Sequence, residues 1–539
     1  MKQIIFWTVT LVLSVGLWAC SSDNPLLNPL AEAGQPAELP QEQSQKPPEL
    51  PPEPEVEAWV YGRLMDANRH QPVDVPVHIS AGEHTASMQG GFFFIKLPVG
   101  REHLLVIEAP VDRYPRTSHR VMAQAGVSTY VELWMLPFGA SETFDVSAGG
   151  LVTTSGAEVV FQPNSLNATG EVTARLAWLN AADEKQLSAF PGGFRTDEGK
   201  LLESFGAIVV EVRDAAGNLV NLNKGAHAAA TIPVSNVPAD TEIPLWVYDE
   251  DAGLWKKEGE PLTDCSSGFC LAELPHLSWW NADIVIQTTC LTVCVADTNG
   301  HPAAGVYIEA RGVDYFNFTT GFSGADGCAC LPVRVDSHVN VTATTLSGDM
   351  GSVNVGPTTL GPLACGSPAC TEVSLTVAPP KFQAILSWEG FEDLDAHLTG
   401  PCPDCVGGQF HVFHGDRGSL SHPFFAALNN DACAFFNEQA SEIISLSACA
   451  EGSYRYSVFN NVGMSSPHTP QATLTLLFPD GSLLSYSAGA SFNALPLWTV
   501  GELQCNVSCE CTWQPINTFE VSDVFLKAGQ CTDKPPVFQ

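Results

Sequence analysis

The run Ile208-Val209-Val210-Glu211-Val212 is followed by the turn sequence Asp214-Ala215-Ala216-Gly217. β-Branched residues favour strands, and a polar, Gly-containing cluster after such a run favours a tight turn. The same pattern recurs along the chain, for example where Leu474–Phe478 precedes Pro479–Gly481. No long stretch keeps the apolar period of an amphipathic helix, and 45 glycines and 39 prolines are spread throughout. We therefore expect an all-β protein made of a string of about four β-sandwich domains.

Length and charge restrict the class of protein. The chain has 539 residues, enough for about three or four domains. The net charge is −35 and only 24 residues are basic, so neither nucleic acid nor an anionic lipid surface is an expected partner. A surface this acidic keeps a protein soluble, and binding of calcium or of a basic partner is the alternative role.

The N-terminus indicates export. Lys2 precedes an apolar stretch from Ile4 to Leu17, which predicts a signal peptide over residues 1–19. The stretch is shorter than the about 20 residues that a membrane-spanning helix needs. It ends in Leu17-Trp18-Ala19-Cys20, which resembles the lipobox of bacterial lipoproteins. That resemblance implies lipidation of Cys20 and a membrane partner held through acyl chains. Ser21 then implies the bacterial outer membrane, on its periplasmic or extracellular face. An ordinary signal peptide followed by a stray cysteine is the alternative.

A linker follows the cysteine. Residues 20–55 are dominated by Pro, Glu, Gln and Ala, and such a segment cannot bury a core. Because Pro-rich chains extend by about 3.1 Å per residue, we expect a disordered stalk that lifts the folded part away from the membrane.

The cysteines divide the chain into two halves. After Cys20 there is none until Cys265, and the other sixteen lie between Cys265 and Cys531. An even number in an exported chain predicts disulfides, with Cys265 and Cys270 closing a hairpin tip. Zinc binding by Cys402/Cys405 and Cys509/Cys511 is the alternative, but no second pair with finger-like spacing accompanies them.

An internal repeat relates residues 59–100 to residues 293–327, and the two domains that contain it are expected over 56–137 and 289–378. Each copy has a strand, a polar turn, a Pro, an alternating strand, a Thr and a Gly-marked turn into another strand. This layout resembles the carboxypeptidase regulatory-like domain, a transthyretin-like β-sandwich. In the first copy the match is carried by Gly62, Asp66, Pro72, Val77, Thr85, Gly91, Phe92, Leu97 and Gly100. The resemblance implies a fold and no peptidase activity, since no set of zinc ligands can be picked out.

Two further units complete the chain. Residues 138–288 contain Pro244–Glu250 and His276–Asp283 with their tryptophans, and this order resembles the extracellular region of cartilage intermediate layer protein and related bacterial lipoproteins. The resemblance implies an interaction or scaffold module. Residues 379–539 open with Trp388 and Asp393-Leu394-Asp395. They resemble an uncharacterised bacterial β-sandwich family, which implies a fold only.

Asp393 and Asp395 form a candidate metal site. Residues two apart on a strand point to the same face, and a hard cation such as calcium would relieve the repulsion between their carboxylates. His397 continues that face, and His411, His414 and Asp431 could approach from other strands. The alternative is a pair of Asx residues that caps turns through the backbone.

Trp246 and Trp279 are candidate ligand-binding residues, because they and the neighbouring tryptophans could form a platform for a sugar. The alternative is packing in the core. No Gly-x-Ser-x-Gly, His-Glu-x-x-His or phosphate-binding loop is present, so we do not expect an enzyme.

Together these features predict a non-catalytic envelope lipoprotein that presents β-sandwich modules for adhesion or scaffolding. Its expected partner is an envelope protein or a glycan. A carbohydrate- or calcium-binding accessory module that supports a secreted enzyme is the alternative function.

Overall fold

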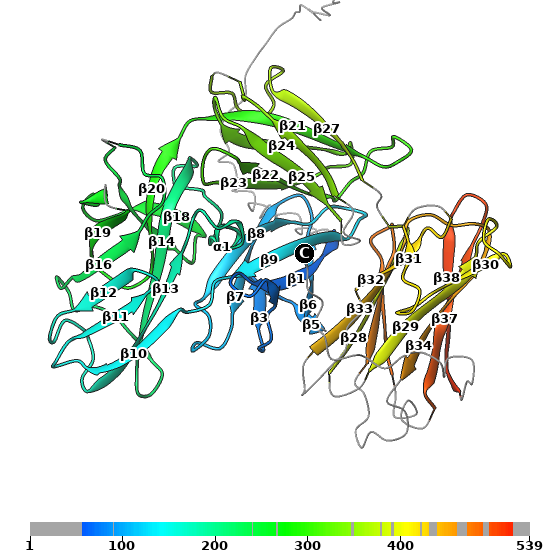
Figure 1. Ribbon diagram of the computed structural model, residues 1–539, viewed down its shortest axis with the longest axis horizontal. Coiled ribbons are helices and arrows are strands. Elements are labelled where there is room, and N and C mark those ends of the chain that lie inside the picture. The colour runs from blue at the N-terminus through cyan, green and yellow to red at the C-terminus, as the bar shows by residue number, and fades with distance from the viewer. Residues whose placement is uncertain are drawn as a thin grey trace, which may run out of the picture. The chain divides into compact units, whose positions relative to one another are not determined.

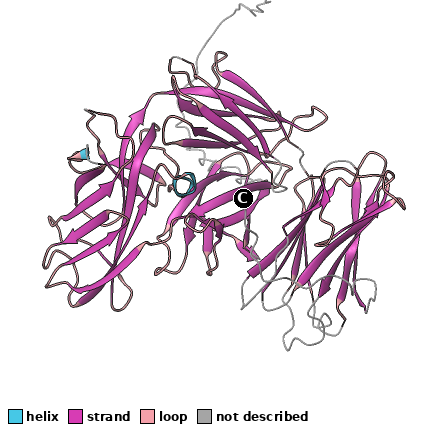
Figure 2. Cartoon of the chain, viewed as in Figure 1, coloured by secondary structure: helices cyan, strands magenta, loops and turns pink. Residues whose placement is uncertain are grey.

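The computed structural model describes residues 56–520 apart from residues 90, 240, 266–267, 346–349, 360, 378–379, 390–392, 421–422, 431–438, 461–471 and 489–494. Strands dominate these residues (Figure 2). Eight sheets pack in pairs, so the prediction of several β-sandwiches is confirmed. No helix in the described part of the chain is long and apolar enough to cross a membrane. The predicted signal peptide, Cys20 and the stalk lie outside the described residues.

The first sandwich contains β1–β9 (Figure 1). One sheet has the order β2-β1-β6-β5 with β9 beside β1, and the other has the order β4-β3-β7-β8. Val60 and Phe93 of one sheet pack against Ile79 and Leu105 of the other. The strands are β1 (Glu57–Asp66), β2 (Gln71–Pro72), β3 (His78–Ala81), β4 (His84–Thr85), β5 (Ser87–Gln89), β6 (Phe92–Pro98), β7 (Glu102–Glu108), β8 (Thr117–Met122) and β9 (Thr129–Met135).

The second sandwich contains β10–β20 and the helix α1 (Glu184–Ser188). Its sheets have the orders β10-β13-β14-β20-β17-β18, with β15 beside β14, and β11-β12-β16-β19. The carboxylate of Asp183 starts the helix, because it accepts hydrogen bonds from the backbone N–H groups of Lys185 and Gln186. The strands are β10 (Ala140–Asp145), β11 (Gly150–Thr154), β12 (Ala157–Phe161), β13 (Glu171–Leu179), β14 (Leu201–Asp214), β15 (Leu219–Val220), β16 (Ala228–Pro233), β17 (Leu245–Asp249), β18 (Leu254–Lys257), β19 (Phe269–Leu274) and β20 (Trp279–Ile286).

The third sandwich has the topology of the first. Its opening strand β21 pairs antiparallel with β24 and parallel with β27, as β1 does with β6 and β9. Its second sheet, β23-β22-β25-β26, corresponds to β4-β3-β7-β8. The internal repeat in the sequence is therefore a repeat of topology. The strands are β21 (Thr288–Ala296), β22 (Tyr307–Gly312), β23 (Phe318–Phe322), β24 (Cys328–Arg334), β25 (Val339–Thr344), β26 (Met350–Val355) and β27 (Thr371–Thr376).

The fourth sandwich contains the sheets β31-β32-β33-β28-β35-β36 and β30-β29-β34-β37-β38. Trp388 and Leu474 of the first sheet pack with Leu398 and Trp498 of the second. The strands are β28 (Phe382–Glu389), β29 (Leu394–Pro401), β30 (Gln409–Val412), β31 (Gly418–Ser419), β32 (Ala426–Asn430), β33 (Gln439–Leu446), β34 (Gly452–Asn460), β35 (Thr473–Leu477), β36 (Leu483–Ser487), β37 (Leu497–Cys505) and β38 (Cys511–Glu520).

Apolar clusters cross the junctions between the first three sandwiches. Met65 and Trp134 of the first sandwich lie in one buried cluster with Trp246 and Trp255 of the second. Leu201 of the second lies in a cluster with residues of the third sandwich. A polar bond accompanies this second junction, because Asn317 Nδ2 donates to the carbonyl oxygen of Leu202 at 2.6 Å. Burial of apolar area across both junctions ties the three sandwiches together.

Candidate functional site

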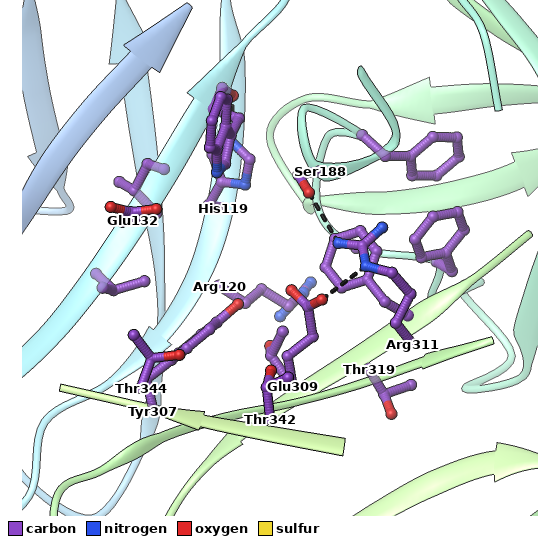
Figure 3. A pocket seen from close by; sticks show the side chains of 18 of the residues that line it. His119, Arg120, Glu132, Ser188, Tyr307, Glu309, Arg311, Thr319, Thr342 and Thr344 are labelled. Atoms are coloured by element: carbon purple, nitrogen blue, oxygen red, sulfur yellow. Dashed lines mark hydrogen bonds and ion pairs between the residues drawn. The ribbon is translucent and has the colours of Figure 1, made fainter. Parts of the chain in front are cut away.

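A cleft of about 410 Å³ is lined by residues of the first three sandwiches (Figure 3). Strand β9 supplies one wall and strands β22 and β25 supply another. The second sandwich contributes α1 and the segment 190–195. A concave site between domains with several polar groups is where a ligand commonly binds.

The wall from β9 carries Tyr130, Glu132 and Trp134, which are two residues apart and therefore share one face of the strand. The Tyr130 hydroxyl donates to Glu132 Oε1 at 3.1 Å. Burial raises the pKa of Tyr130 well above its usual range, and the charge of Glu132 raises it further. Tyr130 therefore acts as a neutral hydrogen-bonding group at physiological pH.

The opposite wall carries Tyr307, Glu309 and Arg311 on one face of β22. The guanidinium of Arg311 donates to Glu309 Oε1 at 2.7 Å and to Ser188 Oγ at 2.8 Å. The same group lies over the ring of Phe318, 4.6 Å from its centroid. Burial, and then the charge of Glu309, raises the pKa of Tyr307 well above its usual range. Figure 3 shows Arg311 reaching from the third sandwich toward Ser188.

Most of the charges in the cleft are paired with one another. Arg120 and Arg195 both contact the carboxylate of Glu102, at 2.9 and 3.0 Å. Lys185 lies 4.7 Å from the centre of the Trp134 ring. Glu132 differs, because no ion pair joins its carboxylate to a cation among the described residues, and it keeps the Tyr130 hydroxyl as its hydrogen-bond donor.

The cleft residues are not arranged as a nucleophile and its base. Ser188 Oγ donates to the carbonyl oxygen of Glu184 at 2.8 Å and accepts from Arg311. His119 Nε2 is bonded to the carbonyl oxygen of Trp134 at 2.9 Å, and burial lowers the pKa of His119 to about 4. A serine nucleophile activated by a histidine would need the two side chains in contact, whereas Ser188 is bonded to Glu184 and Arg311 and His119 to Trp134. The arrangement can bind and orient a polar ligand.

The predicted sugar platform at Trp246 and Trp279 needs correction. Their exposed fractions are 6% and 1%, and their indole N–H groups donate to the backbone carbonyls of Asp283 and Arg116. The register of β17 with β20 sets Trp246 opposite Asn281, which puts Trp246 and Trp279 on one face of the sheet. Residues of the first sandwich pack on that face. A buried indole offers no surface to a sugar, so these residues form the core of the junction.

The structure places a disulfide between Cys265 and Cys270 at the start of β19. The cysteine pairs considered for zinc are also in disulfides, as Cys402–Cys405, Cys449–Cys509 and Cys505–Cys511. The remaining described pairs are Cys290–Cys370, Cys294–Cys328 and Cys330–Cys365.

The two aspartates of the predicted metal site have different surroundings. Asp393 is half-buried and precedes β29, whereas Asp395 is buried within it. One neighbour of Asp395 is His414, whose Nδ1 lies 3.0 Å from Asp395 Oδ1. Asp431 lies outside the described residues. Calcium binding by Asp393 and Asp395 stays a prediction.

Sequence reasoning missed Tyr130, Glu132, Glu309 and Arg311. The signal available was a polar residue two positions from a tyrosine on each of two strands. That pattern occurs on many solvated sheet faces, and only the approach of the sandwiches makes it a cleft.

Comparisons with known proteins give no family. No family model matches the chain, and no curated protein matches it. A solved structure of SAV2460, a protein of unknown function, is 18% identical, with a TM-score of 0.21, over 27% of this chain and 95% of that chain. BcpA, the major pilin subunit of Bacillus cereus, is 8% identical, with a TM-score of 0.13, over 60% of this chain and 99% of that chain. Two B repeat units of the collagen-binding protein of Staphylococcus aureus are 10% identical, with a TM-score of 0.12, over 80% of this chain and 99% of those units. These TM-scores are too low to support an inference about function.

Proposed function

We propose that this chain is a non-catalytic envelope lipoprotein that holds β-sandwich modules as a scaffold or adhesive surface. The observation that supports this most directly is the pair of apolar clusters that cross the junctions of the first three sandwiches. Modules joined by shared apolar clusters can act together as one binding surface. The acyl chains on Cys20 and the Pro-rich stalk would connect that surface to the outer membrane.

The anchor and the exposure can be tested together on whole cells. Intact cells are treated with a protease, and the mass of the N-terminal peptide is measured in parallel. We expect Cys20 to carry acyl chains and the folded part to be cleaved or released from intact cells. A Cys20→Ser variant should leave the membrane fraction. An unmodified Cys20 peptide in the wild-type protein would contradict the lipoprotein assignment, and full protection from protease would place the protein on the periplasmic face.

The scaffold role needs a partner. Cross-linking on intact cells, followed by capture of the chain, should return the same envelope protein or peptidoglycan fragment from wild-type cells and much less of it from Cys20→Ser cells. Repeated capture without a partner would count against scaffolding.

The cleft favours one second candidate function, which is binding of a glycan. Its hydroxyl, carboxylate and guanidinium groups, interleaved with tyrosine rings, are the donors and acceptors that sugars use. On a glycan array we expect binding that Glu132→Gln weakens. Glu142→Gln is the matched control, since Glu142 is exposed on β10 away from the cleft. No binding above background would remove this candidate.

A further inference from the structure

Three imidazoles and a carboxylate gather on one face of the fourth sandwich. Along β29, Leu394, Ala396 and Leu398 enter the core, so Asp395 and His397 point to the opposite face. Both are nevertheless buried, with exposed fractions of 3% and 1%. Burial of two polar side chains costs free energy unless hydrogen bonds, a charged partner or a metal ion satisfies them.

The neighbouring strand brings the other two groups. Strand β30 pairs with β29 so that His411 lies opposite Thr399. Val412 enters the core, which leaves His411 on the outer face with His397. His414 follows in the turn closed between Phe413 and Asp416. The hairpin of β29 and β30 therefore collects all four groups from a segment of 20 residues, Asp395–His414.

The four side chains form two close pairs. His397 Nδ1 lies 2.9 Å from His411 Nε2, and His414 Nδ1 lies 3.0 Å from Asp395 Oδ1. The ring of Phe413 links the pairs, because its centroid lies 5.6 Å from that of His397, 4.5 Å from that of His411 and 5.1 Å from that of His414.

We propose that Asp395, His397, His411 and His414 bind one divalent transition metal ion of the zinc type. Two histidine nitrogens on one zinc, each about 2.0–2.1 Å from the metal, stand about 3.3 Å apart in a tetrahedral site. His397 Nδ1 and His411 Nε2 lie 2.9 Å apart in a hydrogen bond, so the two nitrogens already face each other. A metal ion would replace this hydrogen bond once the donor ring adopts its other tautomer, with the proton on its second nitrogen. Three nitrogen donors and one oxygen donor suit zinc, copper or nickel, whereas calcium takes oxygen donors.

Metal binding must draw the two pairs together. Among the described residues, the group of three donor residues with all ligand atoms within 4.8 Å of one another is Cys449, Cys505 and Cys511, so the two pairs do not yet share one coordination sphere. His414 is the side chain best placed to turn, since 19% of it is exposed and it lies in a turn beyond the end of β30. This site is independent of the scaffold role, and either can fail alone.

The experiment is calorimetric titration of the metal-free, full-length protein with zinc chloride and, separately, calcium chloride. We expect saturable binding of zinc and weaker binding of calcium. His397→Gln and His411→Gln should each weaken zinc binding by at least roughly 100-fold, because each removes a ligand, and loss of a group that only supports a ligand already costs about 10–100-fold. His338→Gln is the matched control, because His338 pairs with Asp314 in the third sandwich and its side chain is 49% exposed.

Two measurements keep the test decisive. His414→Asn removes a donor from a turn at the periphery of the sandwich, so it tests the site even where the buried histidine variants fail to fold. Replacement of zinc by cobalt should give the visible absorption of nitrogen- and oxygen-bound cobalt without thiolate charge-transfer bands. Absence of zinc binding, or zinc binding that survives all three histidine substitutions, would overturn the proposal. Tighter binding of calcium than of zinc would do the same and would favour Asp393 and Asp395 as the ligands.

Discussion

Arg311 Nη2 donates to Ser188 Oγ at 2.8 Å, which ties strand β22 of the third sandwich to the helix of the second. The same guanidinium pairs with Glu309, and its side chain is only 13% exposed. The hydrogen bond crosses the junction between the second and third sandwiches, which also contains an apolar cluster. Its energy therefore measures one part of the interaction between these two sandwiches.

Loss of this contact should be measurable as a coupling energy. Hydrogen bonds to charged groups contribute about 1.5–3 kcal/mol, so we expect Arg311→Ala to lower the free energy of unfolding by about 2 kcal/mol and Ser188→Ala to lower it by less. A double-mutant cycle measures this coupling, from denaturant unfolding of the wild type, the two single variants and the double variant. A coupling of about 0.5 kcal/mol or more supports the contact, and purely additive effects would show that the two side chains act independently.

Gly62 should tolerate no side chain. It lies opposite Val131 in the parallel pairing of β1 with β9, and a Cβ at Gly62 would lie 1.7 Å from the Val131 carbonyl oxygen. We expect Gly62→Ala to destabilise the first sandwich by about 3 kcal/mol or more, because the sheet must separate to admit the methyl group. Gly361→Ala is the control, since no atom lies within 4 Å of that added Cβ. Thermal unfolding distinguishes them, and equal midpoints would contradict the packing of β1 on β9.

The disulfides should contribute different amounts to the free energy of unfolding, according to the lengths of the loops that they close. Cys290 and Cys370 are 80 residues apart, whereas Cys265 and Cys270 are 5 apart. In the chain-entropy description the longer loop loses more freedom in the unfolded state, which favours the longer-range disulfide by about 2 kcal/mol. Denaturant unfolding of the two double Cys→Ala variants tests this difference. A larger loss from the short hairpin pair would mean that Cys265–Cys270 supports native packing instead.

The carboxylate of Asp66 should make the first sandwich sensitive to acid. Its exposed fraction is 2%, and the Tyr114 hydroxyl donates to its Oδ2 at 2.6 Å. Burial alone would raise the pKa of Asp66, but the hydrogen bonds from Tyr114, Arg69 and the backbone hold it below its usual range. Because the folded pKa is lower than the unfolded one, this stabilisation is complete above about pH 4 and is lost as the pH falls from there.

Tyr114→Phe removes one of those donors. We expect it to lower the free energy of unfolding by about 1–3 kcal/mol at neutral pH, and the gap to the wild type should narrow below about pH 4. Asp112→Asn alters an exposed carboxylate in the same segment and should change little. If the difference in unfolding free energy between Tyr114→Phe and the wild type stayed constant as the pH falls below about 4, Tyr114 would be acting through packing alone.

Much of the fold could be predicted from local pattern. Apolar and β-branched runs separated by Gly-containing turns specify strands because each run needs only its neighbours to bury one face. The repeat is visible for the same reason, since each copy carries its own turn and strand signals. The sequence could not decide whether Trp246 and Trp279 form a sugar platform or pack in a core, because alternation assigns residues to a face without saying what covers it.

The candidate sites also depend partly on local pattern and partly on contacts between distant residues. The spacing of Asp395 and His397 determines that they share a face of β29, since the side-chain period of a strand is two. Their meeting with His411 and His414 depends on the register of β29 with β30. The cleft depends on still longer-range contacts, because Glu132 and Glu309 belong to different sandwiches.

The sequence by itself determined that this protein is all-β, that it contains a repeated module and that its cysteines, apart from Cys20, all lie from Cys265 onward. These properties follow from periods and spacings of a few residues. Only the tertiary structure decided which faces are covered, which cysteines pair and which polar groups converge. Those outcomes depend on contacts between residues far apart in the chain, whose partners no local pattern specifies.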